Sequence, residues 1–177
     1  MKRAAYFAAA LSLALLLGGC GASSNGLLSD FTATDIDGND VDASIFEDHD
    51  LTMVNVWGTF CPACLPEMTD LAALNREYAD QGFQVIGIVG DIRYTDGDHK
   101  ENKIQTARDL IAQTGADYLH LLPSESLETA ILNDMQGFPT TYFVDSEGNQ
   151  VGKPYLLARD KDVWAGIIDA LLKDVDK

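Results

Sequence analysis

The fold of this 177-residue chain is decided by W-G-T-F-C-P-A-C at residues 57–64, a stretch with two cysteines three positions apart. The apolar residues 51–57 that lead into it have the length and composition of a buried strand. After it, apolar residues recur at three- and four-residue spacing, which predicts a helix over residues 62–80. The first cysteine is therefore expected where a strand gives way to a helix.

Such a position favours thiol chemistry. The first N–H groups of a helix have no backbone partner, and together with the positive end of the helix dipole they stabilise an anion. We expect this environment to lower the pKa of the Cys61 thiol and to supply the thiolate, the nucleophile of disulfide exchange. Cys64, one turn deeper, is placed to attack a mixed disulfide formed at Cys61.

Two other interpretations of the cysteine pair are weaker. A structural zinc needs four ligands, usually from two such pairs, but the chain has three cysteines, and His49, His99 and His120 are scattered. A purely structural disulfide would close a very small loop and add little stability. A redox-active pair, Cys61 and Cys64, with no metal is the better prediction.

The first twenty residues have the parts of a secretory signal. Two basic residues precede an apolar run over residues 4–17, and small residues follow it. The sequence L-G-G-C at residues 17–20 resembles a bacterial lipobox, which predicts cleavage after residue 19 and lipidation of Cys20. The acyl chains would hold the protein on the outer surface of the bacterial cell membrane. The alternatives are an ordinary signal peptide with a chance cysteine, or an uncleaved anchor.

Loss of residues 1–19 leaves 10 basic and 28 acidic residues, a net charge of −18. This excess argues against nucleic acid as a partner and against electrostatic attachment to anionic lipids, and it favours a solvated surface. We expect residues 20–28 to be the lipidated cysteine and a flexible tether. Residues 29–177 have the length of one domain, which we expect to be a monomer.

Strands and helices are expected to alternate along this domain. The resulting fold class is α/β, with a central sheet covered by helices on both faces. Apolar runs predict strands over residues 31–36, 51–57, 83–89, 118–122, 140–144 and 150–156, the last two as a hairpin, and helical periodicity predicts helices over residues 62–80, 104–115, 127–135 and 164–172, with a polar loop over residues 91–100.

The order of these elements, together with the C-x-x-C stretch, resembles the thioredoxin superfamily, and in particular its TlpA/ResA-like extracytoplasmic thiol–disulfide oxidoreductases. Asn55 stands where cytoplasmic thioredoxins have a buried aspartate, and Glu67 matches a glutamate that the TlpA/ResA-like proteins carry near the dithiol. Residues 100–122 match a helix–strand insertion of that group, and G-F-P-T-T at residues 137–141 matches its proline motif. The resemblance implies a thioredoxin-like fold with a mixed sheet and this added helix and strand.

The resemblance also implies roles for residues near the dithiol. Pro139 matches a cis-proline beside the cysteines, and Phe138 would present its backbone N–H and C=O groups to an extended substrate peptide. Glu67 would have a raised pKa and exchange protons with Cys64, although a solvated surface glutamate is the ordinary alternative. Trp57 would border the substrate site or belong to the core alone.

Apolar packing beside the dithiol is also expected from Phe60. The resemblance further implies reduction of protein disulfides, in apocytochrome c maturation or in repair of oxidised surface proteins. Electrons would come from a membrane thiol donor of the CcdA/DsbD type, and no cofactor is implied.

Three rival functions have weaker support in the sequence. AhpC/TSA-type peroxidases carry P-x-x-x-[TS]-x-x-C, whereas Val54 and Gly58 occupy those positions before Cys61, and Trp57 and Cys61 occupy them before Cys64. Copper-delivery proteins of thioredoxin fold carry C-x-x-x-C, with one more residue between the cysteines. A scaffold without catalytic activity would have no use for a poised dithiol.

Overall fold

A computed structural model describes residues 26–94 and 97–175 of the chain. The expected signal peptide, the expected lipidation site Cys20 and most of the expected tether lie outside these residues. The packed part of the chain begins before residue 29, because Leu28 is 1% exposed and its N–H donates to the carbonyl oxygen of Gly148 at 2.9 Å. Among the described residues, none of the helices is long and apolar enough to cross a membrane.

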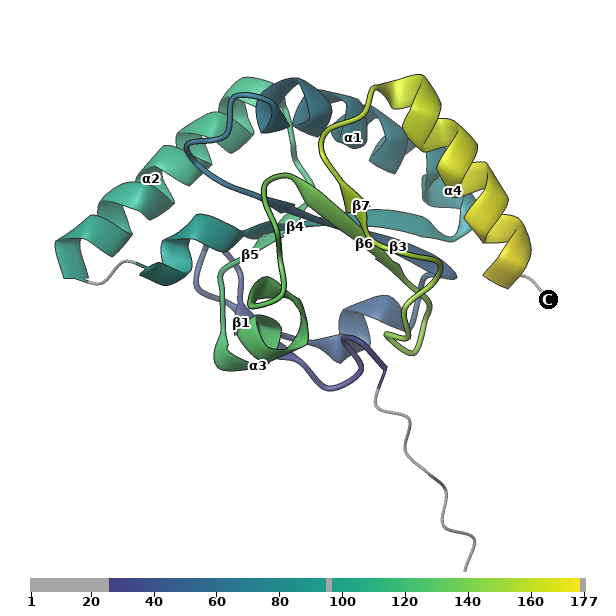
Figure 1. The fold of residues 1–177 in the computed structure, drawn as a ribbon, viewed down its shortest axis with the longest axis horizontal. Helices are drawn as coiled ribbons and strands as arrows, with labels where there is room; N and C mark the ends of the chain where they lie inside the picture. Colours follow the sequence, from purple (N-terminus) through teal and green to yellow (C-terminus); the bar gives the residue numbers. More distant parts are fainter. Residues whose placement is uncertain (1–25, 95–96, 176–177) are drawn as a thin grey trace, which may run out of the picture.

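The centre of the molecule is a mixed five-stranded sheet with the order β5-β4-β3-β6-β7 (Figure 1). Strand β3 lies in the middle, parallel to β4 and antiparallel to β6. All seven of its residues are buried, as expected for a strand covered on both faces. The strands are β3 (Leu51–Trp57), β4 (Phe83–Val89), β5 (Leu119–Leu121), β6 (Thr140–Val144) and β7 (Tyr155–Leu156).

Helices cover both faces of this sheet, which confirms the predicted fold class (Figure 1). One face carries α1 (Cys64–Tyr78), α2 (Gly97–Thr114) and α4 (Lys161–Val175). The other carries the hairpin of β1 (Thr32–Thr34) and β2 (Asp40–Asp42), the 3-10 helix η1 (Ala43–Phe46), and α3 (Glu125–Leu127) with its π-helical continuation η4 (Glu128–Leu132). Two short 3-10 helices, η2 (Ala79–Gln81) and η3 (Gly90–Tyr94), flank β4.

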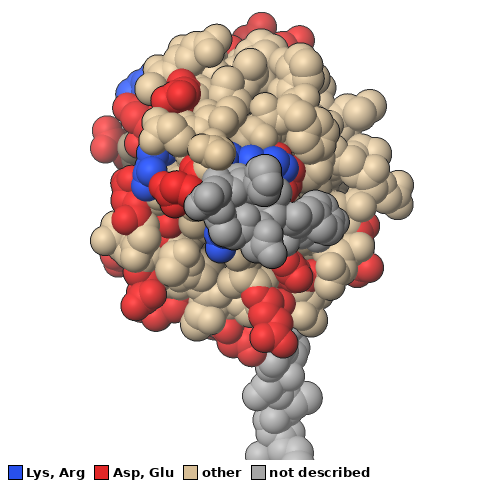
Figure 2. Space-filling model, turned by 90° about the vertical axis from the view of Figure 1, so that its left-hand side faces the viewer, with Lys and Arg blue, Asp and Glu red and all other residues tan. Residues whose placement is uncertain are grey.

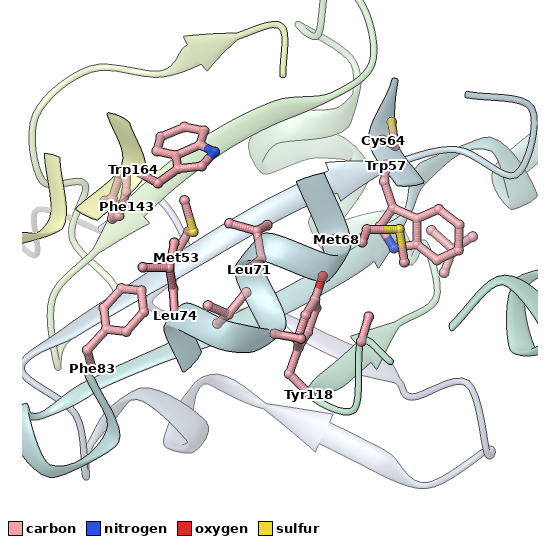
Figure 3. Close-up of a cluster of buried hydrophobic side chains, with 14 of the residues drawn as sticks. Met53, Trp57, Cys64, Met68, Leu71, Leu74, Phe83, Tyr118, Phe143 and Trp164 are labelled. Atoms are coloured by element: carbon pink, nitrogen blue, oxygen red, sulfur yellow. The ribbon is translucent and has the colours of Figure 1, made fainter. Parts of the chain in front are cut away.

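The alternation of side chains along β3 divides the core into two clusters. Met53 and Trp57 pack with the helices α1, α2 and α4, whereas Val54 and Val56 pack with the hairpin and α3. Figure 3 shows the first cluster, with Trp57, Cys64 and Met68 at one end of it. The dithiol therefore stands at the edge of a well-packed core.

Local sequence explains where α1 begins and ends. Ala63 precedes the helix and offers no side-chain cap, so the first N–H groups of α1 meet no capping side chain. The helix ends through η2 at Gly82, whose φ of +70° is the left-handed conformation that glycine adopts most readily. The helix begins at Cys64 rather than at residue 62 as predicted, so Cys61 lies in the turn before it.

Several predicted boundaries were wrong. The polar stretch 91–100 is not a loop, because η3 follows β4 directly and α2 already begins at Gly97. The predicted helix over residues 127–135 begins earlier because the Ser124 hydroxyl accepts the N–H of Leu127. The predicted strand over residues 150–156 shrinks to β7 and one bridge at residue 150, since Pro154 lacks an N–H for the ladder.

Acidic side chains are scattered over the molecular surface. Figure 2 shows one face, on which Asp and Glu are spread around the rim and Lys and Arg are fewer. This distribution agrees with the solvated surface expected from the composition.

Candidate active site

The dithiol lies just beyond the carboxyl end of β3, where the chain makes two successive tight turns. The N–H of Cys61 donates to the carbonyl oxygen of Gly58 at 3.0 Å, and the N–H of Cys64 donates to that of Cys61 at 3.1 Å. Cys61 and Cys64 are joined by a disulfide with Cα atoms 5.4 Å apart. Cys61 is 7% exposed and Cys64 is 0% exposed, so Cys61 is the more accessible of the two cysteines.

The proline loop lies beside these cysteines. The Phe138–Pro139 peptide bond is cis, as the resemblance implies. Within the described residues, neither the N–H nor the C=O of Phe138 has a hydrogen-bond partner. Its ring packs edge-on against Phe60, with centroids 5.5 Å apart. Phe60 is 65% exposed, so the turn before Cys61 and the proline loop together present aromatic surface.

Two leucines extend this surface on the far side of the proline loop. Leu156 lies next to Gly137, and the N–H of Leu157 donates to the carbonyl oxygen of Pro139 at 3.0 Å. Leu156 is 39% exposed and Leu157 is 66% exposed. We call the exposed side chains of Phe60, Leu156 and Leu157, together with the partly buried side chain of Phe138, the apolar patch. Leu157 has a φ of +71°, a left-handed conformation that a leucine adopts only at a cost.

Glu67 is a buried carboxyl group one helical turn after Cys64. It is 2% exposed, and burial raises its pKa above the ordinary value. Hydrogen bonds oppose this shift: Oε1 accepts the backbone N–H of Arg159 and the indole N–H of Trp164, both at 2.9 Å, and Oε2 accepts the amide of Asn55 at 3.2 Å. Glu67 is therefore not the solvated surface acid of the alternative interpretation.

Trp57 lies in the core beneath the dithiol. Its side chain is 0% exposed, and its indole N–H donates to Nδ1 of His120 at 3.2 Å. Nε2 of His120 lies 3.0 Å from the carbonyl oxygen of Ala116, which assigns the neutral tautomer with its proton on Nε2. No part of Trp57 reaches the surface, which favours the alternative in which Trp57 belongs to the core alone.

Sequence reasoning missed the partners of Glu67 and one half of the apolar patch. Trp164 was predicted only as an apolar residue of the last helix, and Arg159 was not singled out. Leu156 was expected at the end of a strand, and Leu157 was not singled out. A polar residue directly after a buried strand is a signal that was available, and it marks Asp91 after β4.

Groups of three or more His, Cys, Asp and Glu side chains that could hold a metal ion do not occur among the described residues.

A C-x-x-C disulfide at the carboxyl end of a central strand, next to a cis-proline on a mixed α/β sheet, defines a thioredoxin-like protein with a redox-active pair. The chain belongs to the AhpC/TSA family, whose model matches residues 27–151.

Curated relatives match shorter stretches. The chain is 40% identical over 57 residues to a probable phospholipid hydroperoxide glutathione peroxidase of Nicotiana sylvestris (32% of this chain, 33% of that one). It is 33% identical over 58 residues to the thiol-disulfide oxidoreductase ResA of Halalkalibacterium halodurans (33% and 32%). It is 30% identical over 104 residues to the thiol:disulfide interchange protein DsbE of Pasteurella multocida (59% and 50%). The chain thus spans between a third and a half of the length of these relatives.

Solved structures share the fold over most of the domain. A thiol:disulfide interchange protein of the thioredoxin family from Chlorobium tepidum superimposes with a TM-score of 0.65, at 21% identity, over 81% of this chain and 93% of that one. The fold is therefore thioredoxin-like, with α2 and β5 as the added helix and strand. Together with the ResA and DsbE matches, this confirms the resemblance to the TlpA/ResA-like proteins of the thioredoxin superfamily.

Proposed function

We propose that this chain is a thiol–disulfide oxidoreductase that reduces disulfides of other proteins outside the cytoplasm. The observation that carries the proposal is the unequal exposure of the pair, with Cys61 slightly exposed and Cys64 fully buried. An incoming disulfide meets Cys61 first, and Cys64 is held where it attacks the Cys61 sulfur once that sulfur is bound to the substrate.

The exchange balances in two steps. The Cys61 thiolate attacks one sulfur of the substrate disulfide, forming a mixed disulfide and releasing the other substrate sulfur as a thiolate. The Cys64 thiolate then attacks the Cys61 sulfur and displaces the first substrate sulfur. The substrate gains two electrons, and the Cys61–Cys64 pair is left as the disulfide seen here.

The apolar patch is the proposed contact surface for the substrate protein. Exposed aromatic and leucine side chains around a reactive sulfur suit an extended, partly apolar peptide segment. The N–H and C=O groups of Phe138 have no partner within the described residues, which suits pairing with the backbone of such a segment. Pro139 holds the loop beside the cysteines.

Glu67 is the proposed proton carrier for Cys64. A buried carboxyl with a raised pKa holds a proton to a higher pH than a surface glutamate does. It lies one turn from Cys64 on the same helix, so it is suited to exchange a proton when that sulfur changes between thiol and thiolate.

We further propose that the protein acts as a lipoprotein, held to the cell membrane through Cys20. Net reduction would draw electrons from a membrane thiol donor of the CcdA/DsbD type, and substrates would be apocytochrome c or oxidised surface proteins. Support comes from the lipobox-like N-terminus and from the names of the ResA and DsbE relatives.

Reduction of insulin by the full-length chain tests the activity. Wild-type protein with dithiothreitol accelerates insulin precipitation, and Cys61→Ala abolishes the acceleration, whereas Cys20→Ser, which removes the remaining cysteine, leaves it unchanged. Unchanged reduction by Cys61→Ala would refute the mechanism. A Cys64→Ser variant is expected to trap substrate proteins as stable mixed disulfides, which identifies them.

Peroxide reduction is the second candidate, favoured by the match to a glutathione peroxidase and by the family description. The peroxidase pattern is absent around both cysteines of the pair, which weighs against it. Thiol-dependent consumption of hydrogen peroxide at a rate comparable to insulin reduction would establish this candidate instead. Tight stoichiometric copper binding by the reduced protein would favour a metal-delivery role.

A further inference from the structure

The turn in front of Cys61 is hydrogen-bonded to a buried carboxylate, that of Asp91. Asp91 lies at the start of η3 directly after β4, and it is 2% exposed. Its Oδ1 accepts the backbone N–H of Thr59 at 2.9 Å, and its Oδ2 accepts the Thr59 hydroxyl at 2.7 Å. Thr59 is two residues from Cys61, so Asp91 fixes the conformation of the chain that delivers the reactive sulfur.

A lysine from the inserted helix binds the same carboxylate. The ammonium group of Lys103 on α2 lies 3.0 Å from Oδ2 of Asp91 and donates to the Asp91 backbone carbonyl oxygen at 3.2 Å. The Lys103 side chain is 34% exposed, whereas that of Asp91 is 3% exposed. The partly exposed ammonium of Lys103 therefore pairs with a buried carboxylate.

This arrangement has an electrostatic consequence for the dithiol. A carboxylate near a thiol opposes formation of the thiolate, and a cation bound to that carboxylate offsets the effect. The other ionisable groups described around the dithiol are the Cys64 thiol and Glu67 on α1, and Arg159, whose N–H binds Glu67. The positive charge of Arg159 acts on Glu67 and lowers its pKa, opposing the effect of burial.

We propose that Asp91 and Lys103 are positioning residues for the dithiol: Asp91 holds the turn before Cys61, and Lys103 balances its charge so that the Cys61 thiolate can form. The insertion of α2 and β5 thereby contributes to the active site, since Lys103 on α2 supplies the balancing cation. This proposal rests on the proposed function in one respect, which is that Cys61 is the attacking sulfur.

The test measures ionisation of Cys61 without any substrate protein. Cys61 in the reduced full-length chain is alkylated with iodoacetamide over a range of pH, in a Cys64→Ser background, and its modification is followed by mass spectrometry. The variants are Lys103→Met, Asp91→Asn, the double variant and Lys103→Arg. Arg76→Met is the matched control, because it breaks an exposed ion pair, with Asp117, away from the dithiol.

The signs of the expected shifts differ between variants. Lys103→Met leaves the carboxylate unbalanced and moves the alkylation midpoint up by about half a pH unit, a roughly threefold slower reaction below the midpoint. Asp91→Asn leaves the ammonium unbalanced and moves the midpoint down. The double variant, Lys103→Arg and Arg76→Met all react nearly as the wild type does.

Three results would overturn the proposal. One is a Lys103→Met midpoint equal to the wild-type midpoint; another is a shift of both single variants in the same direction. A lower thermal unfolding midpoint in all the variants with unmoved alkylation would show a role in folding alone, and would also overturn it. A chain inactive toward insulin would still show these alkylation shifts, so failure of the proposed function is distinguishable.

Discussion

At the scale of single residues, Glu67 experiences two opposing effects. Burial raises its pKa, while the donors from Arg159, Trp164 and Asn55 favour the carboxylate. The raised pKa means that the loss of hydration outweighs the three hydrogen bonds. Among the described residues, the Oδ1 atom of Asn55 is buried without a hydrogen-bond partner, so this amide can turn and accept a hydrogen bond from a protonated Glu67.

Glu67→Gln tests this balance through the pH dependence of stability. Because the folded-state pKa is above the unfolded value, the unfolded chain releases its proton first as the pH rises. The wild type therefore loses stability relative to the glutamine variant as the pH rises from the ordinary glutamate range through the folded pKa. Urea unfolding of both proteins at pH 4 and pH 7 measures the difference. A difference that is the same at both pH values would contradict the assigned shift.

At Leu157 the backbone conformation disfavours a leucine, whereas the proposed substrate contact needs its apolar side chain. An L-residue with a side chain in the left-handed region costs roughly 1–2 kcal/mol, and asparagine tolerates that region better. Leu157→Asn is expected to keep or raise the free energy of unfolding, by up to about 1 kcal/mol, and to lower kcat/KM for insulin several-fold by removing part of the apolar patch.

Val163→Asn is the control for this substitution. Val163 is 47% exposed on α4, so the change removes exposed apolar surface outside the apolar patch. Equal losses of kcat/KM in both variants would show that the patch has no special part in substrate contact.

At the scale of secondary-structure elements, the sequence predicted those whose own pattern is strong. The largely apolar runs of β3 and β4 and the helical period of α1 appear within their own segments, and the structure has the two strands as predicted and the helix with slightly shorter ends. The start of α2 was missed because its first turns are polar and the helix is stabilised by packing further along. β7 was overestimated because side-chain pattern alone does not show the loss of a ladder hydrogen bond at Pro154.

The same reasoning separates the parts of the active site. Cys61, Cys64 and the proline loop belong to short motifs, so they were found from sequence. The contacts of Glu67 with Arg159 and Trp164 join residues 92 and 97 positions apart, and no local pattern encodes such a distance. Leu157 was missed for a related reason, since its exposure depends on a backbone conformation that leucine rarely takes.

The contact between the side chains of Trp57 on β3 and His120 on β5 leads to a prediction for His120. Burial lowers the pKa of His120 to about 4, and the hydrogen bond to Ala116 opposes this shift only in part. In an NMR titration the imidazole is expected to stay neutral, with its proton on Nε2, down to about pH 4.

The lowered pKa of His120 also determines how the stability of the fold changes with pH. The unfolded chain takes up the proton first as the pH falls, so the His120 contribution to stability is lost between the unfolded value, about 6.5, and the folded value of about 4. A midpoint near 6.5 in the folded protein would contradict the buried Trp57–His120 contact.

At the scale of the whole molecule, the surface charge opposes the membrane attachment that the proposed anchor would provide. With a net charge of −18 after removal of residues 1–19, the domain is repelled by anionic lipid headgroups, so attachment would depend on acyl chains at Cys20. We expect full-length protein made in a bacterium to incorporate a fatty-acid label, and high salt to leave it in the membrane fraction because no ionic contact holds it there.

Cys20→Ser is expected to abolish incorporation of the label, since serine offers no sulfur for the lipid. Cys61→Ser is the matched control: it makes the same chemical change at a cysteine of the folded domain and keeps the label. Label on the Cys20→Ser protein would place the modification elsewhere, and release of the wild type by salt alone would mean that charge, not lipid, attaches it. Detergent is therefore the only treatment expected to free the wild-type protein, and the freed protein should reduce insulin as fast as the attached one, because the dithiol belongs to the domain and not to the anchor.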